Sequence, residues 1–303
     1  MHPSPIGRRA GSPKTSATTR PSAVRAAWPA IRNVGKAWLL LLGLCAVLGA
    51  FGWWIAGYRV ASIFVFCGLL LGVAAYWLAD RVAMGMVGAR ELLPGEAPLL
   101  HSSVERLAAR AGVMKPRLYV IPDGFPRALS AGRGAMHSAL AVSTGVLGWA
   151  APAEIDGLLA HEVAHVKNRD VLIQTTAVVL AGSLLEVSRL GGWLSRALLY
   201  VLGPVAASFV HLLLSPRREF EADKLAAALC ESPHGLADAL LRLEQASELV
   251  SFQASPATEP LYTINPFAEE GLAKLFVTHP PVGERVRRLR ELDPDWREKL
   301  RAA

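Results

Sequence analysis

The sequence predicts a mainly helical α+β protein with an N-terminal hairpin of two transmembrane helices. Residues 37–57 and 61–79 contain no charged side chain, and each stretch has the roughly 20 residues that a helix needs to cross a bilayer. The chain of 303 residues is 52% hydrophobic, and its mean hydropathy of +0.32 is high for a soluble protein. Residues 80–303 have room for one further domain, in which helical patterns predominate.

Residues 1–36 are rich in Pro, Ser, Thr, Ala and Arg, and we expect them to form a disordered basic tail in the cytoplasm. They carry seven basic residues and no acidic residue. Since the net charge is +7, the rest of the chain balances 25 basic against 25 acidic side chains. The basic excess therefore belongs to a tail beside a membrane segment and does not indicate a nucleic-acid partner. A secretory signal fits less well, because the first hydrophobic stretch starts late and is long.

The two uncharged stretches are separated only by Tyr58-Arg59-Val60, so we expect them to form a tight hairpin in the lipid bilayer. Positively charged flanks stay on the cytoplasmic side, which places the N-terminus there. Two crossings then return the chain to the cytoplasm at Asp80. The alternative is a hairpin buried within a soluble protein, which the lengths of the two stretches disfavour.

The domain that follows begins with one amphipathic helix and two short strands. Residues 97–112 have the apolar periodicity of a helix, and residues 116–121 and 138–142 have the pattern of strands. The three cysteines show neither a zinc-type spacing nor a disulfide framework.

Next along the chain, residues 161–165 form an H-E-x-x-H motif. Pro152, followed by Glu154 and Asp156, is a favourable start for a helix that carries the motif. Residues four apart share one face of a helix, so both imidazoles can reach one zinc ion and Glu162 can reach a water molecule on that zinc. Zinc lowers the pKa of such a water to about 7, and a carboxylate can take its proton. The other interpretation is a surface helix that spells the motif by chance.

A third zinc ligand is available downstream, where Pro216 can open a new helix with Ser215 as its N-cap. Glu219 and Asp223 are then four residues apart on one face. Glu219 can complete a zinc site, while Asp223 can hold a ligand histidine by its free ring N–H. Without the upstream motif, this pattern would indicate only a charged start of a helix.

Residues 171–214, between the motif and Glu219, form a second hydrophobic segment that we interpret as a hairpin inserted in the domain. The ligands must lie on one side of the membrane, so this segment crosses either not at all or twice. Its length barely suffices for two crossings at about 1.5 Å per residue. From its residues the segment can form two full crossings or a shallow or protein-buried hairpin. The helical pattern resumes from Arg217 to Leu249 and again at 282–290.

Together these motifs resemble the HtpX-type integral-membrane zinc endopeptidases, gluzincin-type relatives of the CAAX prenyl proteases. The residues that carry the resemblance are H-E-V-A-H-V-K-N-R-D at 161–170, S-P-R-R-E-F-E-A-D at 215–223, T-H-P-P at 278–281, Arg285, the stretch 131–147, and Asn265-Pro266-Phe267. The resemblance implies a zincin-like metalloprotease domain, with one Zn²⁺ per chain held by His161, His165 and Glu219.

The resemblance also places His279 near the active site, where its imidazole could donate to a developing oxyanion. Otherwise His279 is a capping or loop residue. Arg285 could brace the site from behind, as Asp223 does, or merely solvate its helix. Related proteases hold an extended substrate on a strand just upstream of the zinc helix, although an ordinary sheet strand is an equal alternative here. The candidate residues of this substrate edge strand are Ala139, Leu140, Ala141 and Val142.

One stretch departs from the family pattern. Where the family usually has Asn-Ala-Phe-Ala ahead of its A/T-G pair, this chain has Arg127-Ala128-Leu129-Ser130. A substrate contact made by that asparagine therefore cannot be assumed here.

The expected function is zinc-dependent endoproteolysis, in which Glu162 is the base. The resemblance implies cleavage of misfolded or damaged membrane proteins in a stress response. It implies a multi-pass protein of the bacterial inner membrane, with its active site in the cytoplasm. A processing protease dedicated to one membrane substrate fits the residues equally well. A membrane-anchored scaffold with a structural zinc is a different class, but structural sites usually have four protein ligands. The sequence leaves the oligomeric state open.

Overall fold

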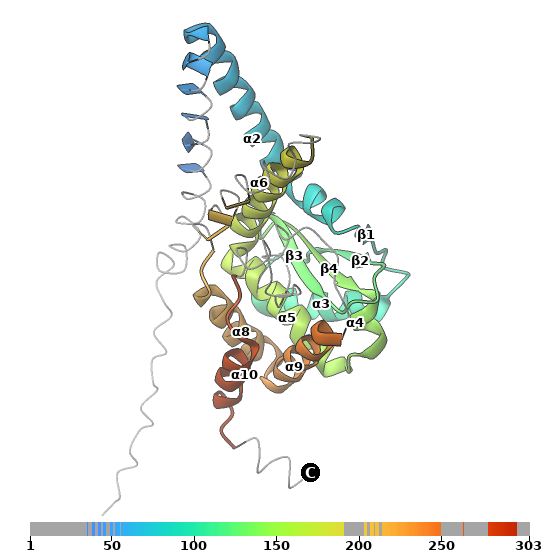
Figure 1. Cartoon of the computed structure of the whole chain (residues 1–303). Coiled ribbons are helices and arrows are strands. Elements are labelled where there is room, and N and C mark those ends of the chain that lie inside the picture. Colours follow the sequence, from blue (N-terminus) through green and yellow to red (C-terminus); the bar gives the residue numbers. More distant parts are fainter. Residues whose placement is uncertain are drawn as a thin grey trace, which may run out of the picture.

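The computed structural model describes residues 56–190, 214–249 and 278–295, with scattered residues at 35–54 and 203–211 and the single residue Thr263 (Figure 1). Almost all of the predicted tail and much of the predicted span at 37–57 lie outside the described residues. The far end of the second predicted hairpin, residues 191–202, also lies outside them.

A four-stranded mixed sheet forms the centre of the domain (Figure 1). Its strands are β1 (Arg90–Glu91), β2 (Arg117–Ile121), β3 (Ala128–Gly134) and β4 (His137–Ser143), in the order β1-β2-β4-β3. β4 runs parallel to β2 and antiparallel to β3. The predicted strands at 116–121 and 138–142 correspond to β2 and β4.

The edge of this sheet differs from the expectation. β4 has a neighbour on both sides, so the edge position expected for residues 139–142 is wrong, and β3 occupies it instead. The β3 sequence A-L-S-A-G-R-G contains no β-branched or aromatic residue, so it carries little strand signal. Gly132 permits its close approach to β4, because a Cβ there would lie 2.4 Å from the carbonyl oxygen of His137. The two edge strands of the sheet are therefore β1 and β3.

Helices cover both faces of the sheet. Alternate residues of β2 and β4, such as Leu118 and Leu140, join a large apolar core with helices on one face. Their neighbours Tyr119 and Ala141 pack in a second cluster against the end of α2 and Val178 of α6. Because both faces are buried, the strands consist of nearly continuous apolar residues. The helices of the large core are α3 (Pro98–Ala111), α5 (Pro152–Asn168), α8 (Arg217–Cys230), α9 (His234–Leu249) and α10 (Val282–Glu291).

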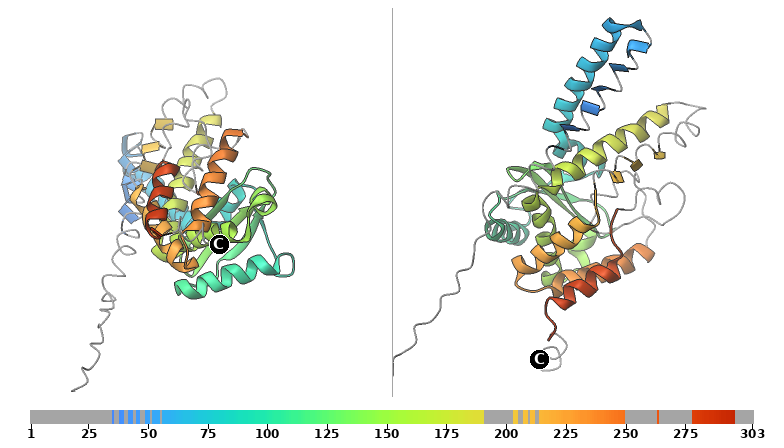
Figure 2. Two further views of the ribbon diagram at one scale, coloured as in Figure 1. Left: turned by 90° about the horizontal axis from the view of Figure 1, so that it is seen from below. Right: turned by 90° about the vertical axis from the view of Figure 1, so that its left-hand side faces the viewer.

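The long helix α2 (Tyr58–Met86) continues beyond the predicted span at 61–79. Asp80 pairs with Arg117 of β2, and Ala83 and Met84 are buried on the sheet, so packing extends the helix past its uncharged stretch. The upstream half projects from the domain, as Figures 1 and 2 show, and exposes large apolar side chains. Among the described residues, none of the helices meets the joint requirements of length and hydropathy for a bilayer span.

The helices that carry the motifs follow the sheet. The short helix α4 (Thr144–Trp149) leads from β4 to α5, and α6 (Asp170–Leu190) follows α5 directly. The helical pattern expected from Arg217 to Leu249 is divided, because the chain turns at Glu231 (φ 59°) between α8 and α9. Residue 216, expected to open α8, is its N-cap, and the cap position expected for Ser215 lies one residue too early.

Two glycines allow α9 to pack against α5. A Cβ on Gly157 would lie 2.5 Å from the backbone nitrogen of Leu236, and a Cβ on Gly235 would lie 2.2 Å from the carbonyl oxygen of Ala153. Any side chain at either position would therefore push the two helices apart. This contact fixes α5, the helix that carries the H-E-x-x-H motif, against the large core.

Candidate metal centre

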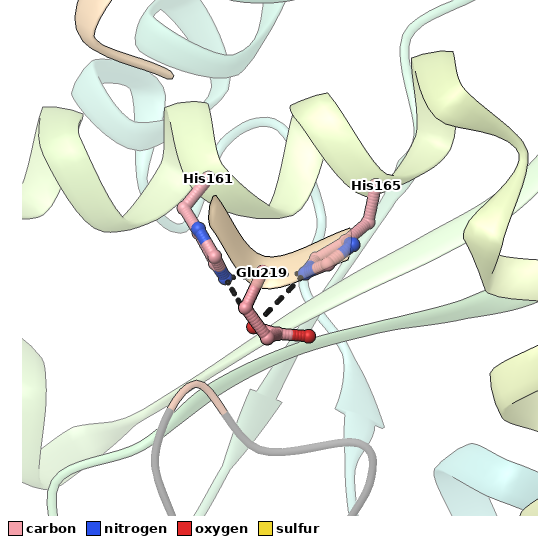
Figure 3. A group of neighbouring side chains, drawn as sticks. All are labelled: His161, His165 and Glu219. Carbon is pink, nitrogen blue, oxygen red and sulfur yellow. Dashed lines mark hydrogen bonds and ion pairs between the residues drawn. The ribbon is translucent and has the colours of Figure 1, made fainter. Parts of the chain in front are cut away.

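The two histidines of the motif point from one face of α5 toward the same point (Figure 3). Their Nε2 atoms lie 3.1 Å apart, and both side chains are buried. The helical spacing of four residues produces this pairing, as expected from the sequence.

Glu219, in the first turn of α8, faces these two imidazoles (Figure 3). Its Oε2 lies 3.4 Å from Nε2 of His161 and 3.6 Å from Nε2 of His165. All three ligand atoms lie within 4.8 Å of one another. Neither oxygen of this fully buried carboxylate accepts a hydrogen bond from a described residue. A buried carboxylate without donors is costly, and two imidazole nitrogens with one carboxylate oxygen are a typical zinc ligand set, so the site fits a zinc ion.

The electrostatics of the site point the same way. Burial opposes the negative charge of Glu219, but His279 and His165 outweigh it and hold the pKa of Glu219 well below its usual value. Burial likewise opposes a charge on His165, but Glu219 and Asp170 raise its pKa to about 10. The carboxylate therefore remains an anion that needs a cation close by, a role that a metal ion can take over from the histidines.

Each ligand histidine is oriented by a carboxylate behind its ring. Asp170 Oδ2 lies 3.1 Å from Nδ1 of His165, and Asp223 Oδ1 lies 3.0 Å from Nδ1 of His161. A carboxylate next to Nδ1 favours the imidazole tautomer that has its ring proton on Nδ1. The lone pair of Nε2 is then free to bind a metal. Asp170 reaches its position because Arg169 adopts a left-handed conformation (φ 60°) that ends α5 and starts α6.

The buried residue Arg285 of α10 completes this arrangement. Its Nε and Nη2 donate to the two oxygens of Asp223 at 2.8 and 2.7 Å. Burial opposes ionisation of Asp223, but Arg285 and His161 lower its pKa to about 2. This two-point contact fixes both position and charge of the carboxylate that holds His161.

Glu162, the expected base, is buried beside the two histidines and contacts two hydroxyl groups. Ser130 Oγ of β3 donates to its Oε2 at 2.7 Å, and Thr263 Oγ1 donates to its Oε1 at 3.0 Å. Both partners are buried. The carboxylate is therefore hydrogen-bonded on both oxygens while it lies next to the ligands.

The side chains of His279 and Arg218 also border Glu219. His279 lies with its Nε2 at 3.7 Å from Glu219 Oε2, on the side that faces the two ligand histidines. Arg218 lies on the other side, with its Nε 3.3 Å from Oε1. The oxygen near the imidazoles and the oxygen near Arg218 are thus in different surroundings.

With this geometry described, the similarity to known proteins can be stated. The family model for peptidase family M48 matches residues 94–293, which include every residue of the site. The chain belongs to peptidase family M48.

Curated relatives in this family are similar over nearly their whole length. A "Protease HtpX homolog" of Pelotomaculum thermopropionicum is 39% identical over 272 residues, which cover 84% of this chain and 97% of the relative. A protein of the same name from Persephonella marina is 36% identical over 275 residues, which cover 84% and 96%. A crystal structure of S. mikatae Ste24p aligns with 18% identity and a TM-score of 0.45. That alignment covers 88% of this chain and 66% of that one, and no conclusion rests on it.

The structure brings the predicted site residues of this M48 chain together, except for residues 139–142. The predicted ligands, Glu162, Asp223, His279 and Arg285 all lie within one buried cluster. Sequence reasoning missed Asp170, Ser130, Thr263 and Arg218. Asp170 could have been found, because it is an acid at the start of the next helix, five residues after His165. The hydroxyl of Thr263 gives no such signal, since 101 residues separate it from Glu162.

Proposed function

We propose that this chain is a membrane-bound, zinc-dependent endopeptidase whose metal is held by His161, His165 and Glu219. The observation that carries the proposal is the convergence of two buried imidazole nitrogens on a buried carboxylate that accepts no hydrogen bond from a described residue, with a second carboxylate beside them. A bound zinc ion supplies Lewis acidity at this point and makes a water molecule more acidic. A structural zinc site would have a fourth protein ligand, and none joins the cluster among the described residues.

Glu162 is the general base and then the general acid of the reaction. It takes one proton from the attacking water as the new C–O bond forms, and it returns that proton to the amine nitrogen as the C–N bond breaks. Its two hydroxyl partners hold it in place before substrate arrives. His279, whose Nε2 lies 3.7 Å from Glu219 Oε2, is the proposed hydrogen-bond donor to the oxyanion.

The edge strand β3 is the proposed binding element for the substrate main chain. Ala128 O is contacted by the hydroxyl of Thr263, and Gly132 N–H donates to Thr175 Oγ1, so this set of main-chain groups faces away from β4. Ser130 lies midway between Ala128 and Gly132 in β3. Main-chain groups of every second residue in a strand point to the same side, so the N–H and C=O of Ser130 also point away from β4. Because Ala128 and Ser130 are almost fully buried, an extended peptide adds to the sheet beside Glu162 only when the contacts that cover this edge are displaced.

The proposed substrates are misfolded or damaged membrane proteins of the bacterial inner membrane, cut from the cytoplasmic side. Support comes from the uncharged stretches at 37–57 and 61–79, from the exposed apolar side chains of α2, and from the sequence resemblance. Extended main-chain recognition fits unfolded segments better than folded ones, because only an unfolded segment can offer a free strand. A protease dedicated to one membrane substrate is the second candidate, since the site residues fit it equally well.

The test uses the full-length protein purified in detergent. Metal analysis should give one zinc per chain, and a membrane protein should be cut faster after destabilisation than in its folded form. The variant Glu162→Gln should keep its zinc and lose about 10²–10⁴ in rate, because only the proton acceptor is removed. Stoichiometric zinc without any cleavage by the wild type would favour a scaffold instead. Equal rates on folded and destabilised substrates would argue against quality control.

A further inference from the structure

The hydroxyl of Ser130 makes the shortest described contact to the side chain of Glu162. Ser130 Oγ lies 2.7 Å from Glu162 Oε2, a length typical of a hydroxyl bound to an ionised carboxylate. Ser130 is 1% exposed and Glu162 is 2% exposed. Water therefore does not replace this donor easily in the described structure.

A glutamate side chain has rotatable bonds that this contact restricts. With Ser130 on one carboxylate oxygen and Thr263 on the other, the plane of the carboxylate is fixed. Each oxygen keeps a second lone pair, so proton transfer is not blocked. A general base must lie within hydrogen-bond distance of the proton that it takes, so a fixed orientation favours the reaction.

An alanine in place of Ser130 would offer no donor to the base. The backbone of β3 does not depend on this difference, because alanine and serine have similar size and both fit a buried strand. The contact is therefore a feature of this chain that can be removed without an expected change of fold.

We propose that Ser130 is a positioning residue for the catalytic base. The inference rests on the proposed function. The hydroxyl of Ser130 contacts Glu162 and both residues are buried, so this one contact sets the direction of the base. Loss of the hydroxyl alone leaves the main-chain contacts intact. The effect therefore falls on kcat, and KM stays the same.

The experiment compares four full-length, zinc-loaded proteins on one peptide substrate: wild type, Ser130→Ala, Ser138→Ala and Glu162→Gln. Ser138 is the matched control, because it is a serine buried in the adjacent strand β4. Ser130→Ala should lower kcat about tenfold, a part of the roughly 10²–10⁴ that a general base contributes, with KM within twofold of the wild type. Ser138→Ala should match the wild type. Zinc content should be equal in all four proteins, so a lower kcat does not reflect lost metal. Ser130→Ala can melt at a lower temperature because a buried acceptor loses its donor, but a merely structural role would not lower kcat at a temperature at which both proteins are folded.

The outcomes separate this inference from the proposed function. If the wild type shows no zinc-dependent cleavage above Glu162→Gln, the proposed function fails. If the wild type cleaves and Ser130→Ala keeps at least half its kcat, or exceeds it, Ser130 is not a positioning residue. A rise in KM with unchanged kcat would assign Ser130 to substrate binding alone and would also overturn the proposal.

Discussion

Replacement of Arg285 by methionine should destabilise the protein far more than any surface substitution. Arg285 is fully buried, and both of its contacts to Asp223 are charge-assisted. The methionine variant leaves the Asp223 carboxylate buried without its counter-charge. Breaking a buried ion pair in this way costs about 3–5 kcal/mol of unfolding free energy.

The pH of the measurement follows from the pKa of Asp223. The folded state lowers this pKa to about 2, so the pair contributes stability above the pKa of an unfolded aspartate, about 4. That contribution is lost only as the pH falls from about 4 through 2. A measurement at pH 7.5 therefore reports the full effect. For a domain of this size, about 1 kcal/mol lowers the melting temperature by about 2–4 °C, so we expect a drop of about 10 °C.

The assay is thermal unfolding of the full-length protein in detergent, with the double variant Arg285→Met/Asp223→Asn as a test of the cause. The second change removes the unpaired charge and should restore at least half of the lost stability. Arg287→Met is the matched control on the same helix, because its salt bridge is exposed and contributes little. A melting temperature of Arg285→Met within 2 °C of the wild type would refute the reasoning, as would a double variant no more stable than the single one.

Three further predictions concern the metal and the membrane. Glu219→Ala should lose most of its zinc in a metal analysis, whereas Glu221→Ala, an exposed change two residues away, should keep it; the reverse result would exclude Glu219 as the ligand. Zinc binding at pH 7 should release about one proton, because the pKa of about 10 keeps metal-free His165 charged while a ligand imidazole is neutral. Calorimetry in two buffers measures this release, which should fall toward zero above pH 10. A cysteine introduced by Ser102→Cys, at an exposed site of a chain free of other cysteines, should resist an impermeant thiol reagent on intact cells; labelling there would reverse the proposed topology.

The sequence predicted those parts of the site whose residues are close together along the chain. The spacing of four residues fixes His161 against His165, and the same spacing fixes Glu219 against Asp223. Pairings between distant segments were harder to predict. Asp223 and Arg285 are 62 residues apart, and only the packing of α10 against α8 brings them together.

The strands show the same limit. β2 and β4 are apolar enough to be identified, but β3 is rich in alanine and glycine and has weak strand propensity. The edge of the sheet was therefore assigned to the wrong strand. The hydroxyl contacts to Glu162 depend on that same edge, so they could not be predicted either.

The order of the site residues along the chain has a consequence for biosynthesis. The base and both histidines leave the ribosome first, then Glu219 and Asp223, and Arg285 follows 62 residues after Asp223. Until α10 has been synthesised, the Asp223 carboxylate lacks the two-point contact that fixes it behind His161. A growing chain can therefore contain all three proposed metal ligands before the contacts that order them are complete.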